Sequence, residues 1–154
     1  MTSPGYGFEK WKTPPGVKFP WHRVEELLTK ARNYWVATSG RSSRPHMAPV
    51  WGIWVDNVFY FSTGPKSRKA RNFRMNSQVA VHPECDNEAV IIEGRVELID
   101  NMATLKPLYD VYKAKYDWDM GGEVLYAVRP AVAFSFKEDL VETAARWEFA
   151  NSDG

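Results

Sequence analysis

The sequence predicts a mainly β protein in which an antiparallel sheet is flanked by helices. Short segments rich in Val, Ile, Trp, Tyr and Phe are separated by turn residues between residues 34 and 63. Apolar residues recur at helical spacing in the segments just before and after this region. The two periodicities together predict one sheet packed against a few helices.

The first half of the sheet is a predicted three-stranded meander. We expect strands at residues 34–39, 45–55 and 58–63, with turns at 40–43 and 56–57. Trp51 and Trp54 are three positions apart, so in a regular strand they face opposite sides of the sheet. At least one of the two is therefore expected to fill the core or an interface.

The second half of the sheet centres on a long strand from Glu88 to Asp100. Gly94 lies in its middle, where a curved sheet needs a kink. Arg129-Pro130 is expected to separate two of the later strands, and Lys137-Glu-Asp to form a turn. The closing strands are predicted at residues 124–128, 131–136 and 146–149.

Two segments with apolar residues at helical spacing are predicted to be packing helices. The first comprises Trp21, Val24, Leu27, Leu28 and Ala31, before the first strand. The second follows the long strand and comprises Met102, Leu105, Leu108, Tyr109, Tyr112 and Tyr116. An aromatic stripe of this kind is more often packing than the mouth of a substrate site, although Tyr109, Tyr112, Tyr116 and Trp118 could line one.

The chain is expected to hold an extended N-terminal arm, residues 1–20, and one domain, residues 21–150. Seven of the first twenty residues are Pro or Gly, which disfavours regular structure. Trp11 and Phe19 suggest that the arm docks on another surface, and a partner subunit is a candidate. The 154 residues, 44% of them hydrophobic, are enough for one core and too few for two ordinary domains.

A basic segment follows the meander. Gly64-Pro65 ends the third strand, and Ser67 is placed to cap a short helix that contains Ala70, Phe73 and Met75. The same segment carries five cations, Lys66 just before the cap and Arg68, Lys69, Arg71 and Arg74 after it. Free backbone N–H groups at a helix start, with Lys and Arg close by, favour an anion such as a phosphate. Basic runs on short helices are also often solvated faces, so spacing alone leaves both interpretations open.

Composition restricts the possible partners. The formal charge is +1, from 20 basic and 19 acidic residues, which gives no long-range attraction to nucleic acid or membrane. Cys85 is the single cysteine and lies between acidic residues, so neither a disulfide nor a reactive thiol is expected. Three His and one Cys show no metal-ligand spacing. The N-terminal segment lacks the apolar core of a signal peptide, so we expect a cytoplasmic protein.

Four motifs follow one another along the chain: Arg44-Pro-His-Met-Ala-Pro-Val-Trp, Phe61-Ser-Thr-Gly-Pro-Lys-Ser-Arg-Lys-Ala-Arg-Asn-Phe, Asn76-Ser-Gln-Val-Ala-Val and Ala144-Ala-Arg-Trp-Glu-Phe. Together they resemble the pyridoxamine 5'-phosphate oxidase-like family of flavin and deazaflavin proteins. The similarity extends from Trp21 to Phe149. It implies a six-stranded antiparallel split β-barrel of the FMN-binding type, which forms homodimers and holds its cofactor at the subunit interface.

The resemblance also implies which residues hold the cofactor. Ser67 and Lys69 would contact the phosphate, with Arg68 and Asn72 close behind. Ser62 and Thr63 would lie along the ribityl chain.

The ring of the cofactor would lie against Pro49, Val50 and Trp51, largely through their backbone groups. Trp147 and Arg146 would reach the same groove from the other subunit. The chain departs from its relatives at Ala145 and Glu148, where they have Thr and a second Arg. No side chain is assigned a catalytic role, and His46 fits a hydrogen-bonded structural histidine better than a proton donor.

The sequence leaves two cofactors open. Flavin mononucleotide (FMN), which ends in one phosphate, is placed slightly ahead. The deazaflavin coenzyme F-420 carries an acidic tail, for which Lys66, Arg68, Arg71 and Arg74 could provide contacts.

The lead functional hypothesis is an oxidoreductase that transfers hydride between the bound cofactor and a small conjugated substrate. Oxidation of pyridoxamine phosphate itself is not expected, since that activity needs a second phosphate site and a longer C-terminal segment. The alternative is a non-catalytic protein that carries flavin, haem or a fatty acyl ligand on the same barrel. A nucleic-acid-binding barrel is disfavoured by the balanced charge.

Overall fold

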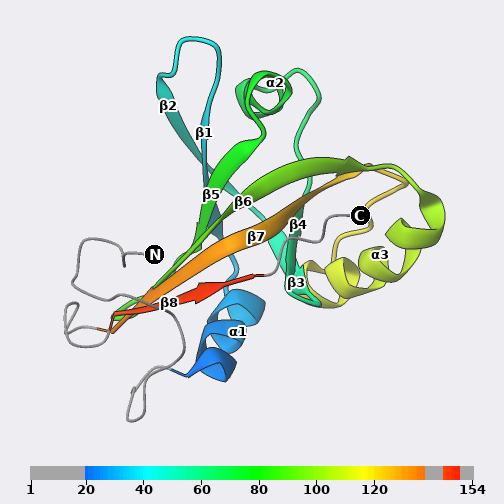
Figure 1. Ribbon diagram of the computed structural model, residues 1–154. Helices are drawn as coiled ribbons and strands as arrows, with labels where there is room; N and C mark the ends of the chain where they lie inside the picture. Colours follow the sequence, from blue (N-terminus) through cyan, green and yellow to red (C-terminus); the bar gives the residue numbers. More distant parts are fainter. Residues whose placement is uncertain (1–19, 138–143, 150–154) are drawn as a thin grey trace.

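The computed structural model describes residues 20–137 and 144–149 and confirms a mainly antiparallel β fold with flanking helices (Figure 1). The helices are α1 (Trp21–Lys30), α2 (Arg68–Met75) and α3 (Met102–Tyr116). The strands are β1 (Tyr34–Ser39), β2 (Pro45–Val50), β3 (Gly52–Val55), β4 (Val58–Phe61), β5 (Gln78–Pro83), β6 (Ala89–Ile99), β7 (Leu125–Phe136) and β8 (Ala145–Glu148). The predicted N-terminal arm and most of the predicted turn after Phe136 lie outside the described residues.

The strands form the six-stranded barrel that the resemblance implies. Hydrogen-bonded neighbours run in the order β2-β1-β5-β6-β7-β4-β3, and every pair is antiparallel. Because β2 and β3 are consecutive and separated by Trp51 alone, they act as one bent strand that closes the ring. The eighth strand, β8, pairs with β7 outside this ring.

Local sequence explains the turns of the meander. Asp56 and Asn57 both adopt positive φ angles, 49° and 62°, and connect β3 to β4 by a two-residue turn. Positive φ at both central positions is the property of a type I′ hairpin turn, which Asp and Asn tolerate well. The predicted turn at residues 56–57 is therefore confirmed.

The expected break at Arg129-Pro130 is wrong, because β7 is continuous. Its register with β6 shifts there: Gly94 pairs with Pro130 and Glu93 pairs with Val132, so Ala131 is an extra residue. Such a bulge accommodates a proline, which cannot donate a ladder hydrogen bond. Gly94 is needed opposite the bulge, since a Cβ there would lie 2.1 Å from the carbonyl oxygen of Arg129.

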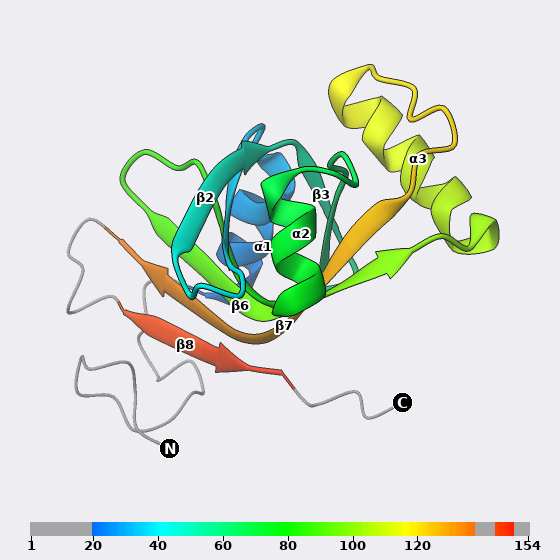
Figure 2. The same ribbon diagram turned by 90° about the horizontal axis from the view of Figure 1, so that it is seen from above.

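Two apolar cores hold the helices on the barrel. The interior of the barrel contains Phe59 and Phe61 of β4, with Val24 and Leu28 from α1 and Phe73 from α2. Helices α1 and α2 cover opposite ends of the barrel (Figures 1 and 2). A second core lies under α3, outside the barrel, and includes Ile53, Val58, Tyr60, Leu105, Leu108, Tyr112, Tyr116 and Leu125.

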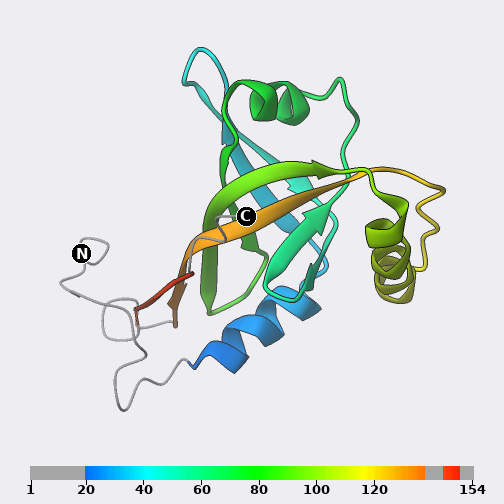
Figure 3. The same cartoon turned by 45° about the vertical axis from the view of Figure 1, so that its right-hand side comes forward.

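Helix α3 therefore stands beside the barrel and packs on the outer side of β3 and β4, as Figure 3 shows. Strand β4 is buried on both faces, because its odd positions enter the barrel and its even positions face α3. Among the described residues, none of the helices has the length and apolar character needed to cross a membrane.

Candidate cofactor-binding site

The N-terminus of α2 is built as the sequence predicts. Ser67 is its N-cap, and the Ser67 hydroxyl accepts a hydrogen bond from the Ala70 N–H at 3.1 Å. The Thr63 hydroxyl donates to the same oxygen at 3.1 Å, and the Ser67 N–H donates to the Gly64 carbonyl at 3.0 Å. These bonds fix the loop that enters α2 and leave the helix start open to an anion.

Cations converge on this helix start. Lys69 is half-buried, and burial lowers the pKa of its ammonium group. His46 of β2 is close by: burial, and then the charges of Arg68 and Lys69, lower its pKa. We refer to His46, Ser67, Arg68 and Lys69 as the basic site. A phosphate bound there would relieve the repulsion between its cations and restore the pKa values toward normal.

The chemistry of the basic site suits a phosphate monoester. A hydroxyl, helix N–H groups and two permanent cations are the donors that bind phosphate oxygens. Among the described residues, no group of His, Cys, Asp and Glu is arranged to hold a metal ion. The site therefore provides donors for an anion and no ligands for a cation.

Asn72 fixes α2 to the barrel. Its side-chain amide donates to the Thr38 hydroxyl of β1 at 2.9 Å, and the Asn76 amide donates to the Ser39 hydroxyl at 3.1 Å. A Cβ on Gly40 would lie 2.4 Å from the Asn72 Oδ1 atom, so the β1–β2 turn passes close over this side chain. Asn72 thus sits one turn beyond the basic site, and its amide is engaged by β1.

Ser62 and Thr63 lie between β4 and the basic site. The Ser62 hydroxyl donates to a carboxylate oxygen of Glu123 at 3.0 Å, whereas Thr63 bonds to Ser67. Both side chains are partly exposed. They belong to the segment that connects the end of β4 to the start of α2.

The predicted ring-binding residues are divided between the core and the surface. Val50 is buried in the barrel interior, whereas Pro49 and Trp51 are exposed. Pro45 and Met47 are exposed on the same face of β2, since alternate residues of a strand share a face. We refer to Pro45, Met47, Pro49 and Trp51 as the apolar stripe. Trp54, in contrast, is buried, so the two tryptophans do face different environments.

Trp51 is held in place by residues that the sequence did not single out for this role. Its ring stacks on Tyr116 of α3, with centroids 4.7 Å apart and an interplanar angle of 6°. The Arg32 guanidinium carbon is 5.2 Å from the Trp51 centroid and 5.3 Å from that of Tyr116. Since the two distances are nearly equal, Arg32 lies beside the stacked pair and not on the outer face of Trp51.

Lys115 is another residue that sequence reasoning missed. Its ammonium group donates to the Gly52 carbonyl at 2.9 Å and to the Tyr34 hydroxyl at 2.7 Å. Burial, with the charge of Arg32 nearby, lowers the pKa of Lys115 to about 8. No sequence pattern distinguishes Lys115 from Lys106 and Lys113 of the same helix, which are exposed.

Arg146 and Trp147 are not brought to the basic site of their own chain. They belong to β8, at the other end of the barrel from α2 in Figure 1. Arg146 is buried and donates to the Glu148 carboxylate at 2.6 Å. The Trp147 ring lies 5.2 Å from the Trp21 ring of α1. Glu148, which stands where the relatives have a second Arg, thus forms an ion pair with Arg146.

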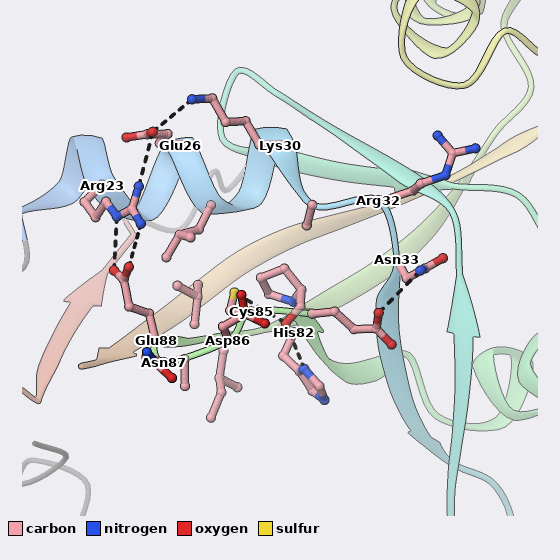
Figure 4. A pocket seen from close by; sticks show the side chains of 17 residues that line it. Arg23, Glu26, Lys30, Arg32, Asn33, His82, Cys85, Asp86, Asn87 and Glu88 are labelled. Carbon is pink, nitrogen blue, oxygen red and sulfur yellow. Dashed lines mark hydrogen bonds and ion pairs between the residues drawn. The ribbon is translucent and has the colours of Figure 1, made fainter. Parts of the chain in front are cut away.

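A groove lies elsewhere, between α1 and the β5–β6 turn (Figure 4). Its charges are mostly paired: Arg23 donates to Glu88 at 3.0 and 2.5 Å, and Lys30 donates to Glu26 at 2.9 Å. A network of satisfied ion pairs offers little to an anionic ligand. We therefore place the candidate cofactor site at the basic site and the apolar stripe, and not in this groove.

Comparison with known proteins gives the family. A family model described as pyridoxamine 5'-phosphate oxidase matches residues 21–143, most of the chain. The chain belongs to the pyridoxamine 5'-phosphate oxidase family. A search of curated proteins gives no significant match.

Several solved structures share the fold. A conserved hypothetical protein of Mycobacterium tuberculosis has a TM-score of 0.70 at 18% identity, covering 94% of this chain and 98% of its own. An FMN-binding protein of Nostoc punctiforme related to pyridoxamine 5'-phosphate oxidase has a TM-score of 0.58 at 18% identity, covering 96% and 94%. An F-420 reductase has a TM-score of 0.58 at 25% identity, covering 71% and 94%.

Proposed function

We propose that this member of the pyridoxamine 5'-phosphate oxidase family is a homodimeric oxidoreductase that binds FMN, with the deazaflavin coenzyme F-420 as the alternative cofactor. The observation that carries the proposal is the basic site at the capped start of α2. Ser67 and Lys69 would bind the phosphate, with Arg68 at its outer side. The lowered pKa of the half-buried Lys69 supports this role, because burial disfavours its charge and no carboxylate in the described part of the chain forms an ion pair with it.

The position of the cofactor ring follows from the apolar stripe. His46 of the basic site and Trp51 of the stripe belong to one bent strand, five residues apart. A ligand with a phosphate at one end and a flat ring at the other could therefore span both features. The backbone of Pro49 and Val50 and the ring of Trp51 would form its wall, and Ser62 and Thr63 would lie along its ribityl chain.

A second subunit would complete the site. The apolar stripe exposes Met47 by 51% and Trp51 by 37%, and such contiguous apolar surface marks an interface or a binding site. Arg146 and Trp147 lie far from the basic site of their own chain, so only a partner could bring them to it. We therefore propose that Trp147, and with it Arg146, faces the cofactor across the dimer interface.

The additional cations of α2 bear on the choice of cofactor. Arg74 donates to the Pro65 carbonyl at 2.6 Å and is thus engaged by its own loop. Lys66 and Arg71 are exposed beside the basic site and could contact the acidic tail of F-420. Because one of the three outer cations is already engaged, we place FMN first.

When bound, an isoalloxazine or deazaflavin ring supplies the hydride chemistry. The chain would bind the phosphate, orient the ring and exclude water from one of its faces. We assign no general acid or base among the described residues.

Anaerobic single-turnover kinetics would separate an enzyme from a carrier. The protein is loaded with reduced cofactor and mixed with a panel of conjugated acceptors, and oxidation of the cofactor is followed by absorbance. The proposal predicts that at least one acceptor is reduced much faster with the protein than with free reduced cofactor. Equal rates for every acceptor would instead support a flavin store or sensor.

A further inference from the structure

We infer that the C-terminal turn of α3, through Tyr116 and Lys115, is a positioning device that fixes the Gly52 peptide and the Trp51 ring, and thereby sets the affinity of the site for the cofactor ring. This inference rests on the proposed function for the identity of the ligand. The positioning itself is a property of the protein alone.

The first observation is that α3 bonds to both backbone polar groups of Gly52, the N–H and the carbonyl. The Gly52 N–H donates to the Tyr116 hydroxyl at 3.0 Å, and the Lys115 ammonium donates to the Gly52 carbonyl at 2.9 Å. The Tyr116 hydroxyl is 2.8 Å from both the Gly52 and the Arg32 carbonyl oxygens. The Tyr116 hydroxyl has one proton, and Lys115 already donates to the Gly52 carbonyl. Donation from Tyr116 to the Arg32 carbonyl therefore satisfies all of these groups.

The second observation is that position 52 admits no side chain. A Cβ there would lie 2.3 Å from the Phe59 ring and 2.9 Å from the Tyr60 carbonyl oxygen. Glycine thus lets β4 pack closely against this position, where the predicted continuous strand bends into β2 and β3. The bend occurs at Trp51, next to Gly52, whose backbone bonds to α3.

The third observation concerns the Trp51 ring itself. Tyr116 covers one face in a nearly parallel stack, and Arg32 lies at the side. The ring still exposes 37% of its surface. An exposed aromatic ring with one covered face and a fixed backbone is a preorganised platform for a flat ligand, because little freedom remains to be lost on binding.

Lys115 is further connected to the barrel interior. It donates to Tyr34, whose hydroxyl in turn donates to the Leu28 carbonyl at the end of α1. The lysine also lies 4.8 Å from the Tyr34 ring centroid and 5.1 Å from that of Tyr116. A cation held by two aromatic rings and two oxygen acceptors has a defined position, unlike a solvated lysine.

The test uses full-length protein and two conservative variants, Tyr116→Phe and Lys115→Met. The first keeps the stack and removes the hydroxyl, and the second keeps the aliphatic stem and removes the ammonium group. Tyr112→Phe and Lys113→Met are the matched controls, since neither side chain bonds to Gly52. The Trp51 ring is followed by fluorine NMR after labelling with 5-fluorotryptophan, and its resonance is assigned from its loss in Trp51→Phe.

We expect both test variants to shift the Trp51 resonance in the free protein and to weaken FMN binding by about fivefold to tenfold, the usual effect of one hydrogen bond. The controls should change neither quantity. In a Trp51→Ala background, Tyr116→Phe should change FMN affinity by less than about twofold, because the hydroxyl acts through Trp51. A purely structural role would lower the melting temperature without this coupling.

An unchanged Trp51 resonance in both variants would overturn the inference, whatever happens to FMN. A shifted resonance with unchanged FMN affinity would also overturn it, since positioning would then have no effect on binding. If the wild type binds neither FMN nor F-420, the proposed function fails instead, and the resonance shift still reports whether α3 positions Trp51.

Discussion

Replacing Lys69 with Met tests the phosphate role most sharply, because the change removes the ammonium group and keeps most of the aliphatic stem. The side chain is half-buried and its pKa is lowered by burial, so its charge carries a desolvation cost in the free protein. A charge-assisted hydrogen bond to a phosphate contributes about 1.5–3 kcal/mol. We therefore expect FMN affinity to fall by roughly 10- to 150-fold, as 1.4 kcal/mol corresponds to a factor of ten.

The assay is calorimetric titration of ligand-free protein with FMN and, in parallel, with riboflavin, which lacks the phosphate. Lys69→Met should weaken FMN binding and leave riboflavin binding nearly unchanged. Lys106→Met, at an exposed position of α3, is the matched control and should affect neither ligand. An equal loss for both ligands would show that Lys69 acts on the fold and not on the phosphate. An unchanged FMN affinity would remove Lys69 from the site.

The pH dependence of FMN binding follows from the same pKa. Because the pKa of free Lys69 is lowered and a bound phosphate would raise it, binding is coupled to proton uptake at alkaline pH. FMN affinity should therefore decrease as the pH rises through the lowered pKa of the free protein. This decrease should be smaller in Lys69→Met, and a profile identical in the two proteins would contradict the coupling.

Three further results are expected. Gly94→Ala places a Cβ 2.1 Å from the Arg129 carbonyl oxygen and should lower the free energy of unfolding, measured in urea, by more than about 2 kcal/mol. Gly64→Ala is the control and should be nearly neutral, because a Cβ there would have nothing within 4 Å. Equal stability of the two variants would refute the close approach at Gly94. Lys115 has a folded pKa of about 8 and an unfolded value near 10.5, so the unfolded chain binds the proton more tightly and this lysine's contribution to stability should rise between pH 8 and 10.5. Denaturation of wild type and Lys115→Met across that range should show the difference, and parallel curves would contradict the burial. Trp147→Phe should keep the packing on Trp21 and weaken FMN binding if the residue faces the partner's cofactor; unchanged affinity by titration would return Trp147 to a packing role.

Much of the barrel could be predicted because its determinants are local. Asp56-Asn57 tolerates the positive φ angles of a tight turn, and Ser67 can accept the N–H three residues on, whatever surrounds them. Gly94 was recognisable as a kink in a long strand. These features depend on one residue type at one position, which a sequence displays directly.

The remaining features depend on contacts between distant segments. Next to the bend at Trp51, the backbone of Gly52 bonds to Lys115 and Tyr116 of α3, which are 63 and 64 residues away along the chain. Pro130 was interpreted as a strand break because a proline disrupts a regular ladder, whereas the bulge at Ala131 absorbs it. Lys115 resembled a solvated helix residue until the fold placed it between Tyr34 and Tyr116.

The candidate site was predicted in part. Six of the predicted residues lie within one short segment, residues 62–72, which includes the start of α2. The fold therefore necessarily gathers them there: Ser62, Thr63, Ser67, Arg68, Lys69 and Asn72. The contribution of His46 required the pairing of β1 with β2, which brings the strand to the helix. The roles of all these residues in cofactor binding remain predictions, and those of Arg146 and Trp147 depend in addition on a second subunit.

Titration of the ligand-free protein with FMN and with F-420 in parallel tests the central claim most directly. The basic site beside the apolar stripe predicts binding of FMN with micromolar or tighter affinity and quenching of Trp51 fluorescence, a signal that is lost in Trp51→Phe. Tighter binding of F-420 than of FMN would exchange the two cofactors and leave the site intact. Binding of neither would contradict the assignment of this surface as a cofactor site.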